Sequence, residues 1–151
     1  MNNKDVHTES IEGELLQNGV CLIKPHGRSM KPLFREGRDA VILKTPDREI
    51  KKYDVVLYAD ALGRHILHRV IAVKRNTFVI RGDNTYKKEF VAKSDILAYM
   101  TSFNRNGKRR GADILGYKLY ARTWHFLYPL RFLFHKFKML IKRILMKKQR
   151  T

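Results

Sequence analysis

Short apolar segments separated by polar turns fill the first two thirds of the chain. The segments have the length of strands and are rich in β-branched residues, and Gly, Pro, Asp and Asn gather between them. This pattern is typical of a mostly antiparallel sheet that is coiled or barrel-like. The predicted strands are residues 20–24, 39–44, 54–59, 65–74, 77–82 and 95–103.

Residues 8–19 have helical rather than alternating periodicity. Ile11 and Leu15 share one face, a Thr or Ser at the start can cap the helix, and Gly19 can end it. We therefore predict a short N-terminal helix in front of the sheet.

A second helical pattern lies near the C-terminus, where apolar residues recur every three or four positions and Pro129 is expected to begin or kink a helix. The predicted fold class is α+β, mainly β: a coiled, mostly antiparallel sheet with a short N-terminal helix and a long, basic, amphipathic C-terminal helix. The apolar stripe of that last helix consists of Phe126, Leu130, Leu133, Phe134, Phe137, Leu140, Ile141 and Ile144.

Charge divides the chain into two parts. The formal net charge is +18, and the last acidic residue is Asp113. Residues 114–151 contain ten Lys or Arg, so we divide the chain into a core, 1–113, and a basic helical tail, 114–151. The tail has three interpretations: it packs on its own sheet with a solvated basic face, it lies in a membrane interface against anionic lipid, or it binds nucleic acid. No nucleic-acid-reading motif accompanies the charge, which disfavours the third.

Several classes of protein are excluded by composition. The single cysteine, Cys21, lies in an apolar run and is predicted to be a small buried residue rather than a nucleophile. Zinc-ligand spacings are absent, so we expect no metal and no cofactor. Residues 1–19 carry four acids and no long apolar stretch, and residues 123–130 form too short an uncharged run to span a bilayer. We predict that the protein is located in the cytoplasm, either free or bound peripherally to the inner face of the membrane.

The segment PHGRSMKPLFREGRDAVIL contains the first candidate for chemistry, Ser29. A serine beside a glycine is usually part of an ordinary turn. His68, however, lies in a strand that is otherwise apolar, and burial there favours the neutral imidazole that a general base needs. The alternative is a core histidine bonded to a backbone carbonyl. Asp83 follows Gly82 in a turn, where it can cap the backbone or orient a histidine on a neighbouring strand.

Five short blocks contain these residues. In their order and spacing, over about residues 20–100, they resemble the serine peptidase superfamily of type I signal peptidases and self-cleaving SOS repressors. The blocks are Ser29-Met30 with Pro32, EGRDAVIL at 36–43, YDVVLY at 53–58, LHRVIAV at 67–73 and RGDN at 81–84.

The resemblance implies a role for each site residue. Ser29 would be the nucleophile, and His68 would be the base, as in the archaeal and endoplasmic-reticulum branch, where bacterial signal peptidases have lysine. The Ser29 N–H would help to hold the oxyanion in the turn that also contains Met30, and Gly27 would allow close approach of an extended substrate strand. The third member of the triad is Asp83, our first choice, or Glu89, or no acid at all.

The chain also departs from these relatives. Arg38 interrupts the first Gly-Asp, and Tyr53 replaces the glycine of the hairpin. The 28 residues before Ser29 are too few for a helix-turn-helix module, and they contain no apolar run that could anchor the chain. We predict a serine endopeptidase that cleaves a peptide or a protein's leader segment by a Ser-His mechanism. The alternative is a catalytically inactive module with a peptidase-like sheet, whose basic tail binds anionic membrane or nucleic acid.

Overall fold

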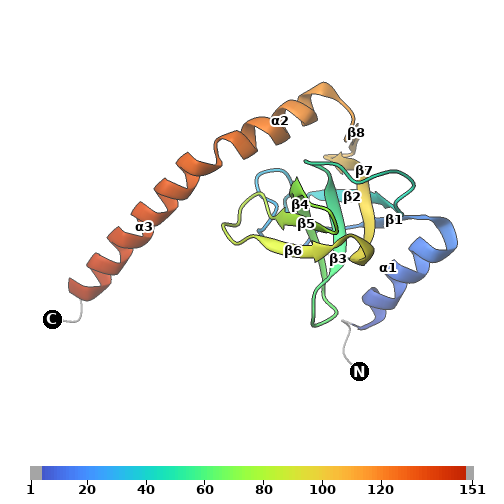
Figure 1. The fold of residues 1–151 in the computed structure, drawn as a ribbon, viewed down its shortest axis with the longest axis horizontal. Coiled ribbons are helices and arrows are strands. Elements are labelled where there is room, and N and C mark those ends of the chain that lie inside the picture. Colours follow the sequence, from blue (N-terminus) through green and yellow to red (C-terminus); the bar gives the residue numbers. More distant parts are fainter. Residues whose placement is uncertain (1–4, 149–151) are drawn as a thin grey trace.

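The computed structural model describes the backbone of residues 5–148 and the side chains of residues 11–146 (Figure 1). The fold is α+β: a mostly antiparallel eight-stranded sheet with three α-helices. The strands are β1 (Val20–Ile23), β2 (Asp39–Lys44), β3 (Val55–Ala59), β4 (His65–Val73), β5 (Thr77–Arg81), β6 (Glu89–Ala92), β7 (Ile96–Arg105) and β8 (Lys108–Gly111). The α-helices are α1 (Asp5–Asn18), α2 (Leu115–Phe126) and α3 (Tyr128–Lys148), and Lys93–Asp95 form one 3₁₀ turn.

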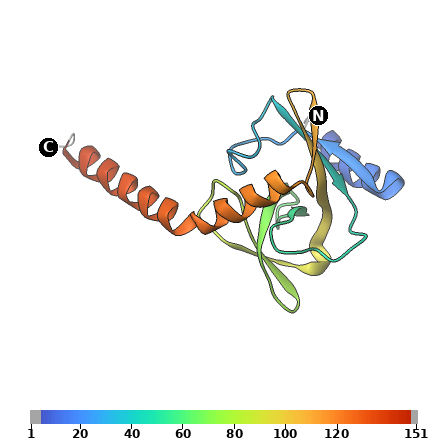
Figure 2. The ribbon, with the colours of Figure 1, turned by 90° about the horizontal axis from the view of Figure 1, so that it is seen from above.

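The strand order is β1-β2-β7-β3-β4-β5-β6, with β8 paired to β7. All of the pairings are antiparallel, and β7 joins the β1-β2 part of the sheet to the β3-β6 part. Irregular registers occur between Ile42 and Leu43, between Leu57 and Tyr58, and between Val70 and Ala72. Such irregularities bend strands and increase their twist, which suits the coiled sheet seen in Figures 1 and 2.

The six predicted strands are confirmed to within two residues at their ends. The pattern missed β6 and β8. The sequence of β8, KRRG, is basic with three exposed side chains, and β6 has only four residues. β8 is a strand because its longer neighbour β7 offers it backbone hydrogen bonds, not because it buries an apolar face; β6 pairs with β5 and buries only Val91.

Two apolar clusters form the core, one around Phe34, Leu43 and Met100, the other around Val56, Val70 and Ile80. Cys21 belongs to the first cluster, so the prediction that it is buried is confirmed. Burial, helped by nearby Glu14, raises the pKa of the Cys21 thiol to about 11, which keeps it a neutral core residue at neutral pH.

The helices differ in how they contact the sheet. The predicted N-terminal helix is present as α1 and packs beside β1. Helix α2 buries Tyr117 and Ala121. Pro129 is the second residue of α3, as expected of a helix start, and α3 extends away from the sheet (Figures 1 and 2). Every side chain of α3 from Leu133 to Met146 is exposed, so the interpretation that this stripe packs on its own sheet is wrong.

None of the helices between residues 5 and 148 combines the length and the apolar character needed to cross a bilayer.

Candidate active site

Ser29 lies in the loop that joins β1 to β2. Three buried apolar side chains, Met30, Leu33 and Phe34, follow it and fasten the loop to the core. The Phe34 N–H donates to the Met30 carbonyl over 2.9 Å, so a tight turn leaves Ser29 half-buried at the surface end of the loop. Ser29 and Met30 are neighbours in the sequence, but in the structure Ser29 is half-buried near the surface, whereas Met30 is buried in the core.

Glu36 holds the other end of this loop. Its carboxylate accepts from the Gly27 N–H over 3.0 Å and lies 2.9 Å from His26 Nδ1. Gly27 has a φ of +81°, which a residue with a side chain adopts only with strain. Apart from its chain neighbours, no described residue has an atom within 4 Å of the position that a Gly27 Cβ would take.

His68 lies on β4 and is buried, with 6% of its surface exposed, as predicted for a histidine in an apolar strand. Its Nδ1 lies 3.4 Å from the Tyr58 hydroxyl and 3.8 Å from Glu89 Oε1. Burial lowers the pKa of His68, while the negative charges of Glu89 and Asp83 act in the opposite direction. The lowered pKa keeps the imidazole neutral at neutral pH.

The hydrogen bonds of Tyr58 indicate which ring nitrogen of His68 holds the proton. Tyr58 OH donates its single proton to Glu89 Oε2, so toward His68 the phenol oxygen can only accept. The matching donor is Nδ1–H of His68. In the neutral ring this leaves Nε2 unprotonated and able to take a proton.

Nε2 of His68 and the backbone of Ser29 meet at Gly82. A Cβ added to Gly82 would lie 2.7 Å from the Ser29 carbonyl oxygen and 2.9 Å from His68 Nε2, closer than real Cβ atoms come. The Asn84 N–H also donates to the Ser29 carbonyl over 2.7 Å. The turn that follows β5 therefore holds the serine loop against the histidine, and only glycine fits at this point.

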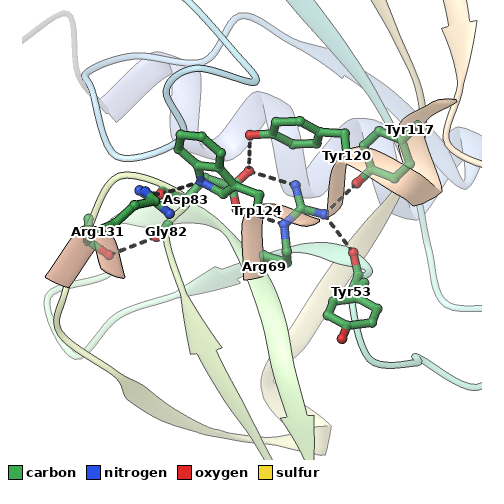
Figure 3. Close-up of polar contacts among 9 residues, drawn as sticks. Tyr53, Arg69, Gly82, Asp83, Tyr117, Tyr120, Trp124 and Arg131 are labelled. Carbon is green, nitrogen blue, oxygen red and sulfur yellow. Dashed lines mark hydrogen bonds and ion pairs between the residues drawn. The ribbon is translucent and has the colours of Figure 1, made fainter. Parts of the chain in front are cut away.

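Asp83 lies in the same turn but binds elsewhere (Figure 3). Its carboxylate forms a two-point ion pair with Arg69, at 2.7 Å for both contacts, and accepts from Tyr120 OH over 3.0 Å. Both side chains of the pair are almost fully buried. Burial opposes the charge on Arg69, but Asp83 and Tyr117 outweigh it, so the pKa of Arg69 lies above its ordinary value.

The structure thus brings the Ser29 main chain and the His68 ring to the same turn at Gly82, although no hydrogen bond among the side chains that the structure describes joins the Ser29 hydroxyl to His68. It directs the Asp83 carboxylate to Arg69. Among residues 11–146, no hydrogen bond joins Asp83 to His68; the carboxylate nearest to Nδ1 is that of Glu89. Asp83 still influences His68 through its charge. Its observed contacts are those of a residue that supports the turn.

A cavity of about 380 Å³ lies over the candidate residues. Gly27, Ser29, Met30 and His68 all contribute to its wall. The remaining wall is mainly apolar and comes from α1, β1, β3, β4 and the loop between β1 and β2; it includes Ile11, Ile23, Pro25, Phe34, Leu57, Ile66 and Leu67. The part of the chain that the structure describes contains no group of three or more His, Cys, Asp or Glu that could hold a metal ion. The polar side chains at the cavity wall include the Ser29 hydroxyl and the His68 imidazole.

Comparison with known proteins finds no family model that matches this chain and no curated protein that matches it.

Sequence reasoning did not find Tyr58 or the contact at Gly82. Tyr58 lies on β3 among apolar residues and looks like core, and its role depends on Glu89, which is 31 residues away in the chain. The sequence RGDN predicts a turn at Gly82. It does not show why a glycine is needed there, because that need comes from the close approach of the serine loop and His68 in the folded chain.

Proposed function

We propose that the protein is a serine endopeptidase with the signal peptidase-like type of core, in which Ser29 is the nucleophile and His68 the general base. The single observation that carries this proposal is the meeting of the Ser29 backbone and His68 Nε2 at Gly82, beside one cavity. The Ser29 main chain, on a loop, and the His68 ring, on a strand 39 positions later, lie at the wall of the same cavity, and this supports their assignment as nucleophile and base.

The chemistry follows from the protonation state of His68. The Ser29 hydroxyl attacks the peptide carbonyl as Nε2 takes its proton, and the imidazolium then gives the proton to the leaving amine. The acyl group left on Ser29 is released by water, with His68 as base again. Glu89 stabilises the imidazolium through its charge, and Tyr58 holds Nδ1–H in position. We assign the acid of the site to Glu89 rather than to Asp83.

The strand edges beside the cavity suit an extended peptide. β1 is at the end of the sheet and pairs with β2, and β5 pairs with β4 only from Arg69 onward. Within residues 5–148, neither β1 nor His65–His68 has a second neighbouring strand. Residues of both edges line the cavity, so a substrate strand placed there can add backbone hydrogen bonds to either edge.

The test compares new protein N-termini in cells that produce the wild-type chain, Ser29→Ala or His68→Ala, by mass spectrometry. We expect a set of new N-termini with the wild type that disappears with both variants. Ser94→Ala is the matched control, because Ser94 is an exposed serine whose hydroxyl contacts only neighbouring Asp95. This control is expected to retain every cleavage.

Two results would overturn the proposal. If folded Ser29→Ala yields the same N-termini as the wild type, Ser29 is not the nucleophile. If none of the four chains changes the N-termini in cells that hold its natural neighbouring proteins, the sheet is a non-catalytic binding module and Ser29 is a turn residue.

A further inference from the structure

The structure leaves a long apolar surface uncovered on α2 and α3. On α2, Leu115, Leu119 and Phe126 lie on the face opposite buried Tyr117 and Ala121. On α3, at about 100° per residue, eight exposed apolar side chains fall in a sector of about 140°, while exposed Met139 and Met146 lie on the opposite side of the helix. The eight are Leu130, Leu133, Phe134, Phe137, Leu140, Ile141, Ile144 and Leu145. Monomeric soluble proteins rarely expose continuous apolar surface of this extent.

The first turns of α3 fix the direction in which this sector faces. Tyr86, in the loop after the Gly82 turn, contacts the rings of Tyr128, Phe132 and His135. These three residues lie on the side of α3 opposite the apolar sector. The apolar sector therefore faces away from the sheet, and the residues that the structure describes leave its side chains exposed.

Positive charges border the sector on both sides. Lys138 and Lys142 follow one border, and Lys136 and Arg143 follow the other. Between residues 114 and 148 there are nine Lys or Arg and no Asp or Glu. The apolar sector and its two basic borders together form what we call the basic-apolar face of α3.

The charge decides which occupant fits this face. A second copy of the chain would bring two sets of positive charges together, which opposes association. A nucleic acid would match the charge but leave the apolar sector in water. A bilayer that contains anionic phospholipid matches both, because the apolar side chains enter the acyl region while Lys and Arg reach the phosphates. We propose that the basic-apolar face of α3 binds the surface of an anionic membrane, with the helix lying in the plane of the interface.

The experiment is flotation of the full chain with vesicles of phosphatidylcholine alone or with about one third phosphatidylglycerol. We expect binding only with the anionic lipid, and weaker binding at higher salt. Leu133→Ser with Phe137→Ser is expected to lower the partition coefficient about tenfold or more. The matched control is Leu62→Ser with Phe90→Ser, two apolar residues of similar exposure that lie outside α3 and are expected to leave binding unchanged.

A second measurement does not depend on loss of binding. Phe137→Trp places an indole on the basic-apolar face, and its emission is expected to shift to shorter wavelength on addition of anionic vesicles. The same substitution at Phe90 is expected to show no shift. The purified chain used here keeps Ser29, and neither readout depends on peptidase activity, so the membrane proposal and the proposed function can fail separately.

Three outcomes would contradict the proposal. Vesicle binding that the α3 double variant retains would place the lipid contact elsewhere. A dimer in sedimentation that the same variant dissociates, without vesicle binding, would make the face a contact between copies of the chain. Binding to a DNA duplex but not to anionic vesicles would assign the charge to nucleic acid.

Discussion

At the scale of single residues, the site depends on the proton at Nδ1 of His68. The neutral ring is the proposed base, and burial lowers its pKa below the ordinary value of 6.5. Activity is therefore expected to be complete at neutral pH and to fall as pH drops through that lowered pKa. The pH dependence of kcat/KM for a cleaved peptide measures this fall in activity, which is the acid limb of the profile.

The variant Glu89→Gln tests whether Glu89 is the acid of the site, because the direction in which the pH profile moves is predicted. The Glu89 charge raises the pKa of His68, so its removal moves the acid limb to lower pH, and the plateau rate falls about tenfold or more because the imidazolium loses its counter-charge. A limb that moves to higher pH would rule out this role for Glu89.

Tyr58→Phe tests the positioning of the imidazole. We expect a similar loss of plateau rate, because Nδ1–H loses its acceptor. Tyr99→Phe is the matched control, since Tyr99 is also buried and also donates to a carboxylate, that of Asp47, away from the site. If both variants lose the same activity, Tyr58 supports the fold rather than the base.

Gly82 carries a second prediction at this scale. Gly82→Ala forces the Ser29 carbonyl or His68 to move, so we expect kcat/KM to fall by about 10²-fold or more. Gly116→Ala is the control, because nothing lies within 4 Å of its added Cβ and its position is helical. Full activity in Gly82→Ala would show that the approach at this turn is not needed.

At the scale of elements, the Arg69–Asp83 pair joins β4 to the turn after β5 and to α2. Arg69 also donates to the Tyr53 carbonyl and to Tyr117 OH. The Asp83 carbonyl accepts from Trp124 Nε1 over 2.8 Å, so the turn is held from both sides (Figure 3). The ion pair positions the turn that holds Ser29, although its carboxylate binds Arg69 rather than His68.

Removing this carboxylate is expected to destabilise the whole fold. Asp83→Ala leaves the buried charge of Arg69 unpaired, which costs about 3 kcal/mol or more in the free energy of unfolding. Asp95→Ala, at an exposed acid, is expected to change it by about 0.5 kcal/mol or less. Urea denaturation measures both, and equal values would contradict the structural role assigned to Asp83.

At the scale of the whole molecule, the chain combines a packed sheet with a helix that extends from it. Arg131 Nη2 donates to the Asp83 carbonyl over 2.6 Å, so α3 is joined to the turn that supports the candidate site. If both proposals hold, a membrane-bound α3 keeps the cavity at a constant distance from the lipid surface.

Stability measurements distinguish this arrangement from a helix packed on the sheet. Phe137 is 60% exposed and Phe34 is 2% exposed. Without lipid, Phe137→Ala is expected to change the free energy of unfolding by about 0.5 kcal/mol or less, while Phe34→Ala costs about 3 kcal/mol or more. A large loss from Phe137→Ala would mean that α3 packs against the domain in solution.

The sequence by itself determined the features that depend on local pattern. Short apolar, β-branched runs between turn residues predict β2, β4 and β5 because such side chains pack well on a pleated, buried surface; β4 and β5 are buried on both faces. An apolar run around His68 predicts its burial, and the absence of acids after Asp113 predicts a basic helix.

Only the tertiary structure decided the features that depend on residues distant in the chain. The carboxylate that faces Nδ1 of His68 is that of Glu89. The sequence motif favours Asp83 for this position, but the Asp83 carboxylate forms an ion pair with Arg69 instead. Sequence order carries no information on that competition, since a buried guanidinium binds whichever carboxylate the fold brings within reach. The direction of α3 is set in the same way, by the contacts of its first turns with Tyr86 and Asp83 rather than by its own periodicity.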